Sequence, residues 1–195
     1  MKPSVILWDL MDTLVRDPFF THMAPFFGLR FEELLATKHP TAWGVFESGR
    51  IDEQELFRRF FRDGRTIDGA GLKRCMEQAY AWVDGMEPLV QELHVRGVEM
   101  HLLSNYPHWY RLCDERLGVS RYVKPSFVSC HTGVRKPSAE AYLNVCRTLK
   151  LGPAQCLFID DREPNCAAAR ALDIDSVRFE GVAGLRDALE QRGLL

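Results

Sequence analysis

The chain has 195 residues, 46% of them hydrophobic, which is enough for one sizeable core and a small accessory module. Its formal net charge of −2 at pH 7 points to neither a nucleic-acid partner nor a charged membrane surface. The six cysteines are scattered without a Cys-x-x-Cys pair, which argues against a zinc finger and a disulfide scaffold.

The first predicted element is a buried strand formed by the apolar run Val5–Trp8. Asp9 follows it directly and opens a polar segment that includes Met11 and Asp12. In open α/β sheets, reactive groups gather outside the carboxyl ends of the strands. An aspartate in this position is often only a turn former or helix cap, so the rest of the chain has to decide its role.

The sequence pattern predicts several short helices over residues 16–84, with breaks at Pro40, Gly44 and Gly49. The pattern is best defined over residues 52–62, where Asp52 is a candidate cap and Gly64 a natural stop. Nine of the 12 phenylalanines lie between residues 19 and 61. They predict either the core of a small helical module or an apolar substrate pocket beneath a lid.

From residue 85 onward, short apolar strands alternate with helices. Strands are predicted over 98–103, from 127, over 157–159 and over 175–179, and helices over 88–96, 109–117, 138–149, 166–172 and 184–191. This alternation predicts an α/β fold, a Rossmann-like parallel sheet with helices on both faces. We expect residues 1–15 and 85–195 to form the core, and residues 16–84 to form a helical cap above the carboxyl edge of the sheet.

Polar residues follow three of the predicted strands or precede a helix. Asp9 ends the first strand, Ser104 the second, Lys136 precedes a helix, and Asp160 and Asp161 end a third strand. In this order the segments resemble the motifs of the haloacid dehalogenase superfamily, whose nucleophile loop is usually Asp-x-Asp-x-Thr. The motifs and flanking helices span nearly the whole chain. The resemblance implies the same α/β fold with a helical cap.

The resemblance also implies a chemistry. Asp9 would be the nucleophile that forms an aspartyl-phosphate, which water then hydrolyses. Mg²⁺ would bind to Asp9, the backbone carbonyl of Met11 and the pair Asp160 and Asp161, with Asp161 favoured as a direct ligand.

Three further groups are expected to bind the phosphate. The Ser104 hydroxyl, the Asn105 backbone N–H and the Lys136 ammonium are the donors that the resemblance implies. Lys136 is also catalytic in this scheme, because it would hold Asp9 and the phosphate in register. Only six lysines accompany nineteen arginines, so a lysine here is a distinctive residue. Asn165 is expected to cap the helix that begins near residue 166.

Met11 departs from the family pattern, because the family's phosphatases carry there the Asp that protonates the leaving oxygen. Methionine cannot transfer a proton, and general acid–base help is worth about 10²–10⁴ in rate. Three explanations remain open: Asp12 replaces the missing carboxyl, the leaving group needs no proton, or the protein binds phosphate with little turnover. Neighbouring residues on an extended segment point to opposite sides, which weighs against Asp12.

The favoured function is therefore Mg²⁺-dependent hydrolysis of a small phosphorylated metabolite, slowed by Met11. The main alternative is an inactive phosphate-binding or regulatory module. A 2-haloacid dehalogenase is less favoured, because those enzymes generally lack the acidic pair. The phosphonate-cleaving branch needs a cap lysine, and only Lys38 and Lys73 lie in this cap.

The expected partner is a small phosphorylated molecule, with no nucleic acid and no membrane. No apolar stretch of signal-peptide length precedes Asp9, and a cytoplasmic location is the expectation. Substrate identity and oligomeric state do not follow from the sequence.

Overall fold

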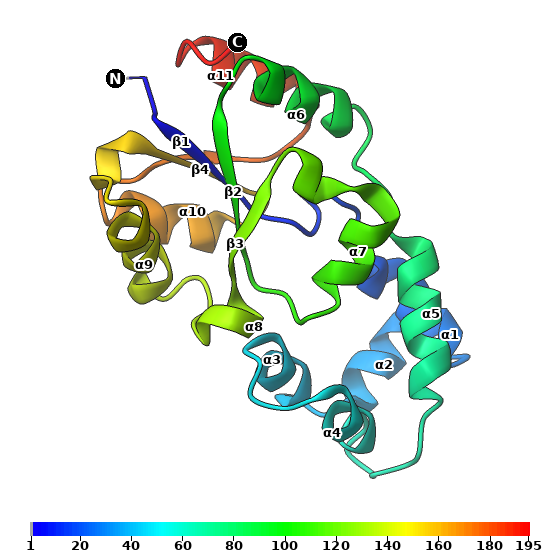
Figure 1. Cartoon of the computed structure of the whole chain (residues 1–195). Coiled ribbons are helices and arrows are strands. Elements are labelled where there is room, and N and C mark those ends of the chain that lie inside the picture. Colours follow the sequence, from blue (N-terminus) through cyan, green and yellow to red (C-terminus); the bar gives the residue numbers. More distant parts are fainter. Residues whose placement is uncertain (1) are drawn as a thin grey trace.

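A five-stranded sheet in the order β3-β2-β1-β4-β5 is the centre of the α/β part, and all four strand pairings are parallel (Figure 1). The computed structural model describes residues 2–195. The strands are β1 (Val5–Trp8), β2 (Glu99–Ser104), β3 (Lys124–Val128), β4 (Cys156–Asp160) and β5 (Asp175–Arg178). The predicted Rossmann-like parallel sheet is confirmed.

Helices cover both faces of the sheet, and the apolar side chains of strands β1 to β4 alternate between two apolar clusters. Ile6 and Trp8 of β1 belong to one cluster, whereas Val5 and Leu7 belong to the other. The first cluster includes residues of α6 (Met86–Val95), α7 (Tyr110–Leu117) and α11 (Val182–Glu190). The second includes residues of α9 (Ala139–Leu149) and α10 (Glu163–Arg170). Short α8 (Ser129–Thr132) and the 3-10 turns η2 (Val119–Arg121) and η3 (Pro153–Gln155) complete this part.

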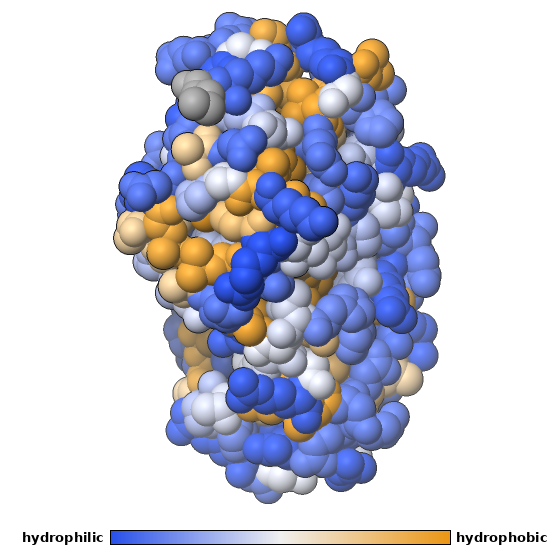
Figure 2. Space-filling view, turned by 60° about the vertical axis from the view of Figure 1, so that its left-hand side comes forward, coloured by the Kyte–Doolittle hydropathy of each residue, from blue (hydrophilic) through white to orange (hydrophobic). Residues whose placement is uncertain are grey.

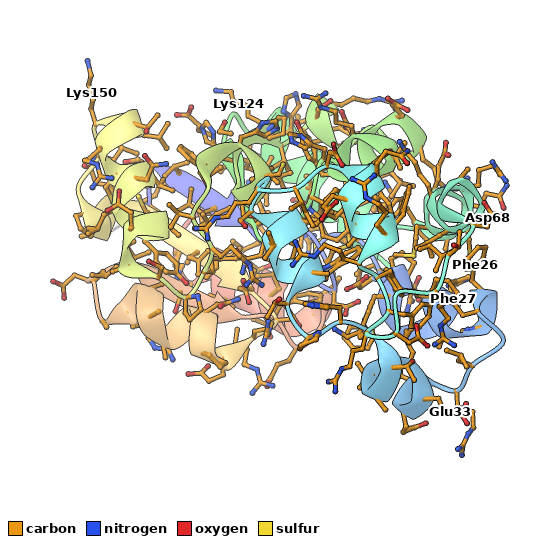
Figure 3. The ribbon with its side chains drawn as sticks, turned by 90° about the horizontal axis from the view of Figure 1, so that it is seen from below. Phe26, Phe27, Glu33, Asp68, Lys124 and Lys150 are labelled. Carbon is orange, nitrogen blue, oxygen red and sulfur yellow. The ribbon has the colours of Figure 1, made fainter. Side chains whose placement is uncertain are left out.

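The chain between β1 and α6 is helical. It forms a π-helical turn η1 (Phe19–Met23) and the helices α1 (Ala24–Phe26), α2 (Phe31–Thr37), α3 (Ala42–Glu47), α4 (Glu53–Arg58) and α5 (Gly69–Ala79). These helices gather beside the sheet at the lower right of Figure 1. In Figure 3, Phe26, Phe27, Glu33 and Asp68 lie at this end of the molecule, opposite Lys150.

Two connecting segments join the helical part to the sheet, and they run side by side. Val15 forms an antiparallel bridge with Trp82. The Arg16 N–H donates to the Ala81 carbonyl at 2.9 Å, and the Val83 N–H donates to the Leu14 carbonyl at 2.9 Å. These two hydrogen-bonded segments lie near residues 16 and 84, the predicted boundaries of the cap. The cap itself remains a prediction.

The helical part differs from the prediction in two places. Gly44 lies inside α3 and does not interrupt it. The helix predicted over 52–62 ends at Arg58, well before Gly64. The reason is that the backbone after α4 pairs with a distant segment: the His39 N–H donates to the Phe60 carbonyl at 2.7 Å. A contact between segments this far apart overrides the local helical pattern.

The cap at the start of α4 is confirmed, since Asp52 Oδ1 accepts a hydrogen bond from the Glu55 N–H at 2.7 Å. Phe60 and Phe61 are buried, and the Phe27 ring lies 5.0 Å from each of theirs, so they form part of the helical module's core. None of the helices formed by residues 2–195 combines the length and the apolar character that spanning a bilayer requires. Most of the face in Figure 2 is hydrophilic, with separate hydrophobic areas.

Candidate active site

A cavity of about 470 Å³ lies where the carboxyl ends of three strands meet the helical part. Asp9 follows β1, Asn105 follows β2 and Asp161 follows β4, and all three line the cavity. The sheet part also contributes Met11, Asp12, Tyr106, Arg135, Lys136, Arg162 and Asn165, and the segment 16–84 contributes Asp17, Phe19, Phe20, Leu35, Lys38, Trp43 and Glu47. Phe19 and Phe20 line the cavity, whereas Phe60 and Phe61 lie in the core of the helical part.

Two contacts hold α3 against the sheet part beside this cavity. The Arg135 guanidinium lies 2.6 Å from a carboxylate oxygen of Glu47. The Ser129 hydroxyl donates to the Glu47 backbone carbonyl at 2.6 Å. Burial raises the pKa of Glu47, and Arg135 acts against that rise. The helical part is therefore in polar contact with the sheet part at the rim of the cavity.

Three carboxylates converge at the floor of the site, because β1 and β4 are adjacent and parallel and end at the same edge. Oxygen atoms of Asp9, Asp160 and Asp161 lie within 4.8 Å of one another. The Lys136 ammonium donates to Asp9 Oδ1 at 2.7 Å and to Asp160 Oδ2 at 2.6 Å. Four predicted site residues are thus brought together, and Lys136 contacts Asp9 as expected.

The electrostatics of this cluster follow from burial. Burial is the main influence that raises the pKa of Asp9 to about 7, with contributions from Asp160 and Asp161 and with Lys136 acting in the opposite direction. Burial and Asp160 also raise the pKa of Asp161. Burial alone would lower the pKa of Lys136, but Asp9 and Asp160 together raise it, so the lysine is a cation.

The donor set fits a hard divalent cation. Three carboxylates face one ammonium, so the buried cluster has a net negative charge when its carboxylates are ionised. Carboxylate and carbonyl oxygens are the ligands that Mg²⁺ prefers, and it tolerates a site where two or three protein groups bind it. Asp161 is only partly buried and lines the cavity, whereas Asp160 is fully buried. This difference agrees with Asp161 as the direct ligand.

Two asparagines fix the charged side chains, and the sequence did not predict either contact. Asn165 Nδ2 donates to both carboxylate oxygens of Asp160 at 3.0 Å. Its predicted role as a helix cap is wrong, because α10 begins at Glu163 and the side chain turns back to β4. The Asn105 side chain bonds the backbone of Lys136 in both directions at 2.8 Å. These bonds orient Asp160 and Lys136 towards each other.

The remaining predicted residues differ in position. The Ser104 hydroxyl is buried, lies outside the cavity lining and has no hydrogen-bond partner in the described chain. Met11 and Asp12 both line the cavity. The extended backbone on which the argument against Asp12 depended is not present, because Asp12 has a left-handed backbone with φ 56°. Aspartate and asparagine tolerate this conformation better than most residues.

Comparisons with known proteins point to one enzyme family. A family model described as "Hydrolase: haloacid dehalogenase-like hydrolase" matches residues 3–173. The chloroplastic flavin mononucleotide hydrolase 1 of Arabidopsis thaliana is 43% identical over 193 residues, covering 99% of this chain and 79% of that protein. The sesquiterpene phosphatase astK of Aspergillus oryzae is 26% identical over 137 residues, covering 67% and 68%.

A similar fold occurs in a haloacid dehalogenase family enzyme of Bacteroides thetaiotaomicron, solved with magnesium and inorganic phosphate. Its TM-score is 0.70 at 21% identity, and the match covers 94% of this chain and 98% of that chain. This likeness supports the fold. The family model and the Arabidopsis relative extend over most or nearly all of the sequence.

Proposed function

The chain belongs to the haloacid dehalogenase-like hydrolase family, and we propose that it hydrolyses phosphate monoesters by way of an aspartyl-phosphate on Asp9. The observation that carries this proposal is the contact of Asp9 with Lys136 at the floor of the cavity, beside Asp160 and Asp161. The ammonium holds the Asp9 carboxylate in one orientation, and the cavity gives an ester access to it.

In the first step, an Asp9 carboxylate oxygen attacks phosphorus, and the bond from phosphorus to the ester oxygen breaks with its electron pair on the leaving alcohol. In the second step, water attacks phosphorus and the electron pair of the broken bond returns to Asp9. When bound, Mg²⁺ would be held by Asp9, Asp161 and the Met11 carbonyl and would neutralise charge between the carboxylates and the phosphate. Asp160 would keep Lys136 in place.

The predicted phosphate-binding groups keep their proposed roles. The Ser104 hydroxyl has no partner in the described chain and is free to donate, but it is buried outside the cavity lining, so it would reach a phosphate oxygen only after a local movement. The Asn105 side chain is engaged with Lys136, which leaves its backbone N–H as the group for phosphate. Lys136 lines the cavity next to Asn105.

We propose flavin mononucleotide as the substrate. The helical side of the cavity presents Phe19, Phe20 and Trp43, and Tyr106 lies on the sheet side. Aromatic faces stack well on a planar ring system such as a flavin. The 43%-identical relative is named as a flavin mononucleotide hydrolase. The test is release of riboflavin and inorganic phosphate in the presence of Mg²⁺, compared with small sugar phosphates, which offer no ring to stack.

Adding Mg²⁺ is expected to raise the melting temperature of the protein, since the cation binds the folded carboxylate cluster. At about 100-fold excess over the dissociation constant, the gain in stability is about 2.7 kcal/mol. Thermal melting with and without millimolar Mg²⁺ measures it. Asp161→Asn should lose most of the shift, whereas Asp84→Asn, at an exposed ion pair with Arg16, should keep it. An equal shift in both variants would place the cation elsewhere.

Phe20→Ala is expected to raise the KM for flavin mononucleotide about 2- to 10-fold, the value of one aromatic contact. Phe20 is 55% exposed, so its truncation should cost little stability. The KM for acetyl phosphate, which has no ring, should stay unchanged. Val95→Ala, at an exposed position of α6, is the matched control. An equal rise in KM for both substrates would show that Phe20 does not contact the ring.

A further inference from the structure

The proposed hydrolysis leaves one requirement unmet: a group that transfers a proton to and from the reacting oxygens. Met11 occupies the place where the family pattern has a carboxyl group, and a thioether cannot serve. An alkoxide is a poor leaving group without a proton, and a positioned acid or base accelerates such a step by about 10²–10⁴. The inference below rests on the proposed function and assigns this proton transfer to a residue of this chain.

Asp17 lies on the wall of the same cavity as Asp9 and Met11. The chain reaches it by a tight turn after Met11, in which the Asp12 N–H donates to the Val15 carbonyl at 2.6 Å and residues 11 and 15 form a bridge. This turn brings the chain back towards the site after Asp9. A residue eight positions beyond the nucleophile therefore faces the same space.

The Asp17 carboxyl group is held on one side and free on the other. Its Oδ1 accepts a hydrogen bond from the Phe19 N–H at 2.9 Å. The structure gives Oδ2 no hydrogen bond within residues 2–195. The Asp17 N–H donates to Asp12 Oδ1 at 2.9 Å, so the Asp12 carboxylate supports the backbone that carries Asp17. One oxygen thus fixes the group, and the other is left for a ligand.

The surroundings of Asp17 favour its protonated form more than water does. Burial raises the pKa of Asp17 to about 7, with smaller contributions from Asp12, Glu47 and Asp161 and with the Phe19 N–H acting against them. The other charged groups that line the cavity are Asp9, Lys38, Arg135, Lys136 and Arg162. A carboxyl group that is partly protonated near neutral pH can act as an acid in one step and as a base in the next.

We propose that Asp17 is the acid and base of the reaction, in place of the carboxyl group that Met11 lacks. In the first step, the Asp17 carboxyl proton moves to the leaving oxygen as its bond to phosphorus breaks, so that a neutral alcohol departs. In the second step, the Asp17 carboxylate takes a proton from the attacking water as oxygen bonds to phosphorus. Asp9 is released, inorganic phosphate forms and Asp17 is again protonated.

Asp12 is a positioning residue in this scheme. Its Oδ1 is engaged with the Asp17 N–H, and its left-handed backbone shapes the turn that presents Asp17. The Asp17 carboxyl group is held in place through Oδ1, and its Oδ2 is free to transfer a proton. This assignment replaces the earlier hypothesis that Asp12 itself transfers the proton.

The test is Asp17→Asn, because an amide oxygen can still accept from the Phe19 N–H but cannot transfer the proton. We expect kcat/KM for flavin mononucleotide, which reports the transfer to Asp9, to fall about 100-fold or more. The fall in kcat/KM for p-nitrophenyl phosphate should be much smaller, because p-nitrophenolate departs without a proton. The second step is common to both esters, so kcat is expected to fall for both. The loss of wild-type kcat/KM for flavin mononucleotide as pH rises through about 7 should disappear in the variant. Asp84→Asn is the control for loss of a surface carboxylate.

A second variant keeps the test decisive if Asp17→Asn is unstable. Met11→Asp introduced together with Asp17→Asn should recover part of the activity on flavin mononucleotide. An Asp17→Asn variant that leaves the ratio of kcat/KM for flavin mononucleotide to kcat/KM for p-nitrophenyl phosphate unchanged would overturn the inference while the proposed function stands. So would a selective loss on flavin mononucleotide in Asp12→Asn with none in Asp17→Asn. Wild-type protein that hydrolyses neither ester with Mg²⁺ would overturn the proposed function and the inference together.

Discussion

Asp9→Asn is expected to abolish hydrolysis of phosphate esters, with a fall in kcat on the order of 10⁴-fold or more. An amide cannot attack phosphorus to form the acyl-phosphate bond, and no other group replaces the attacking oxygen in our account. Asp160 would still bond Lys136, so the lysine keeps one of its two partners. Steady-state release of phosphate from flavin mononucleotide with Mg²⁺ measures the effect.

The same experiment separates an enzyme from a phosphate-binding module. Wild-type activity far above that of Asp9→Asn is the result that we predict. Equal activity of the two proteins would mean that the observed turnover does not depend on this carboxylate, and the site would then bind phosphate without the proposed chemistry. Circular dichroism of both proteins checks that they are equally folded.

Lys136→Met is expected to cause the largest loss of stability among the variants of the site, about 3–5 kcal/mol. The side chain is 1% exposed and its ammonium contacts both Asp9 and Asp160, so its removal leaves two buried carboxylates without their cation. Urea denaturation in the presence of a chelator measures the free energy of unfolding. Lys124→Met is the matched control, since Lys124 forms an exposed ion pair with Glu99 that should contribute about 1 kcal/mol or less.

The loss of stability in Lys136→Met should become smaller as pH falls. Burial already raises the pKa of Asp9 above its ordinary value, and removing the ammonium removes the influence that lowers it. A group with a raised pKa stabilises the fold when protonated and loses that contribution as pH rises through the folded-state pKa. The deficit relative to wild type should therefore narrow as pH falls. A deficit that widens on acidification would contradict this account of the pair.

Much of the sheet could be predicted, because apolar runs such as Val5–Trp8 and the alternation after residue 85 determine a parallel α/β fold. The meeting of Asp9 with Asp160 and Asp161 follows from the same argument, since neighbouring parallel strands end at one edge. Lys136 could be placed near them only through the resemblance to a family. Its two ion pairs required the structure.

The contacts that escaped prediction join segments far apart in the chain or depend on a single backbone turn. Asn165 reads as a helix cap until α10 is placed beside β4. Asp17 belongs to none of the sequence motifs, and it lines the cavity because the chain turns back at Asp12, which has a left-handed backbone. The side chains of His108, Cys130 and His131 form a second group, in which one nitrogen or sulfur atom of each residue lies within 4.8 Å of the others. The positions of these residues in the sequence did not indicate this group.

The most direct measurement concerns the covalent intermediate on Asp9. The protein is quenched while it turns over flavin mononucleotide with Mg²⁺, reduced with borohydride and mapped by mass spectrometry of its peptides. Borohydride converts an aspartyl-phosphate to homoserine, so we predict homoserine at position 9, dependent on substrate and absent from Asp9→Asn. Continued release of phosphate without modification at position 9, or with homoserine at another carboxylate such as Asp161, would contradict the account.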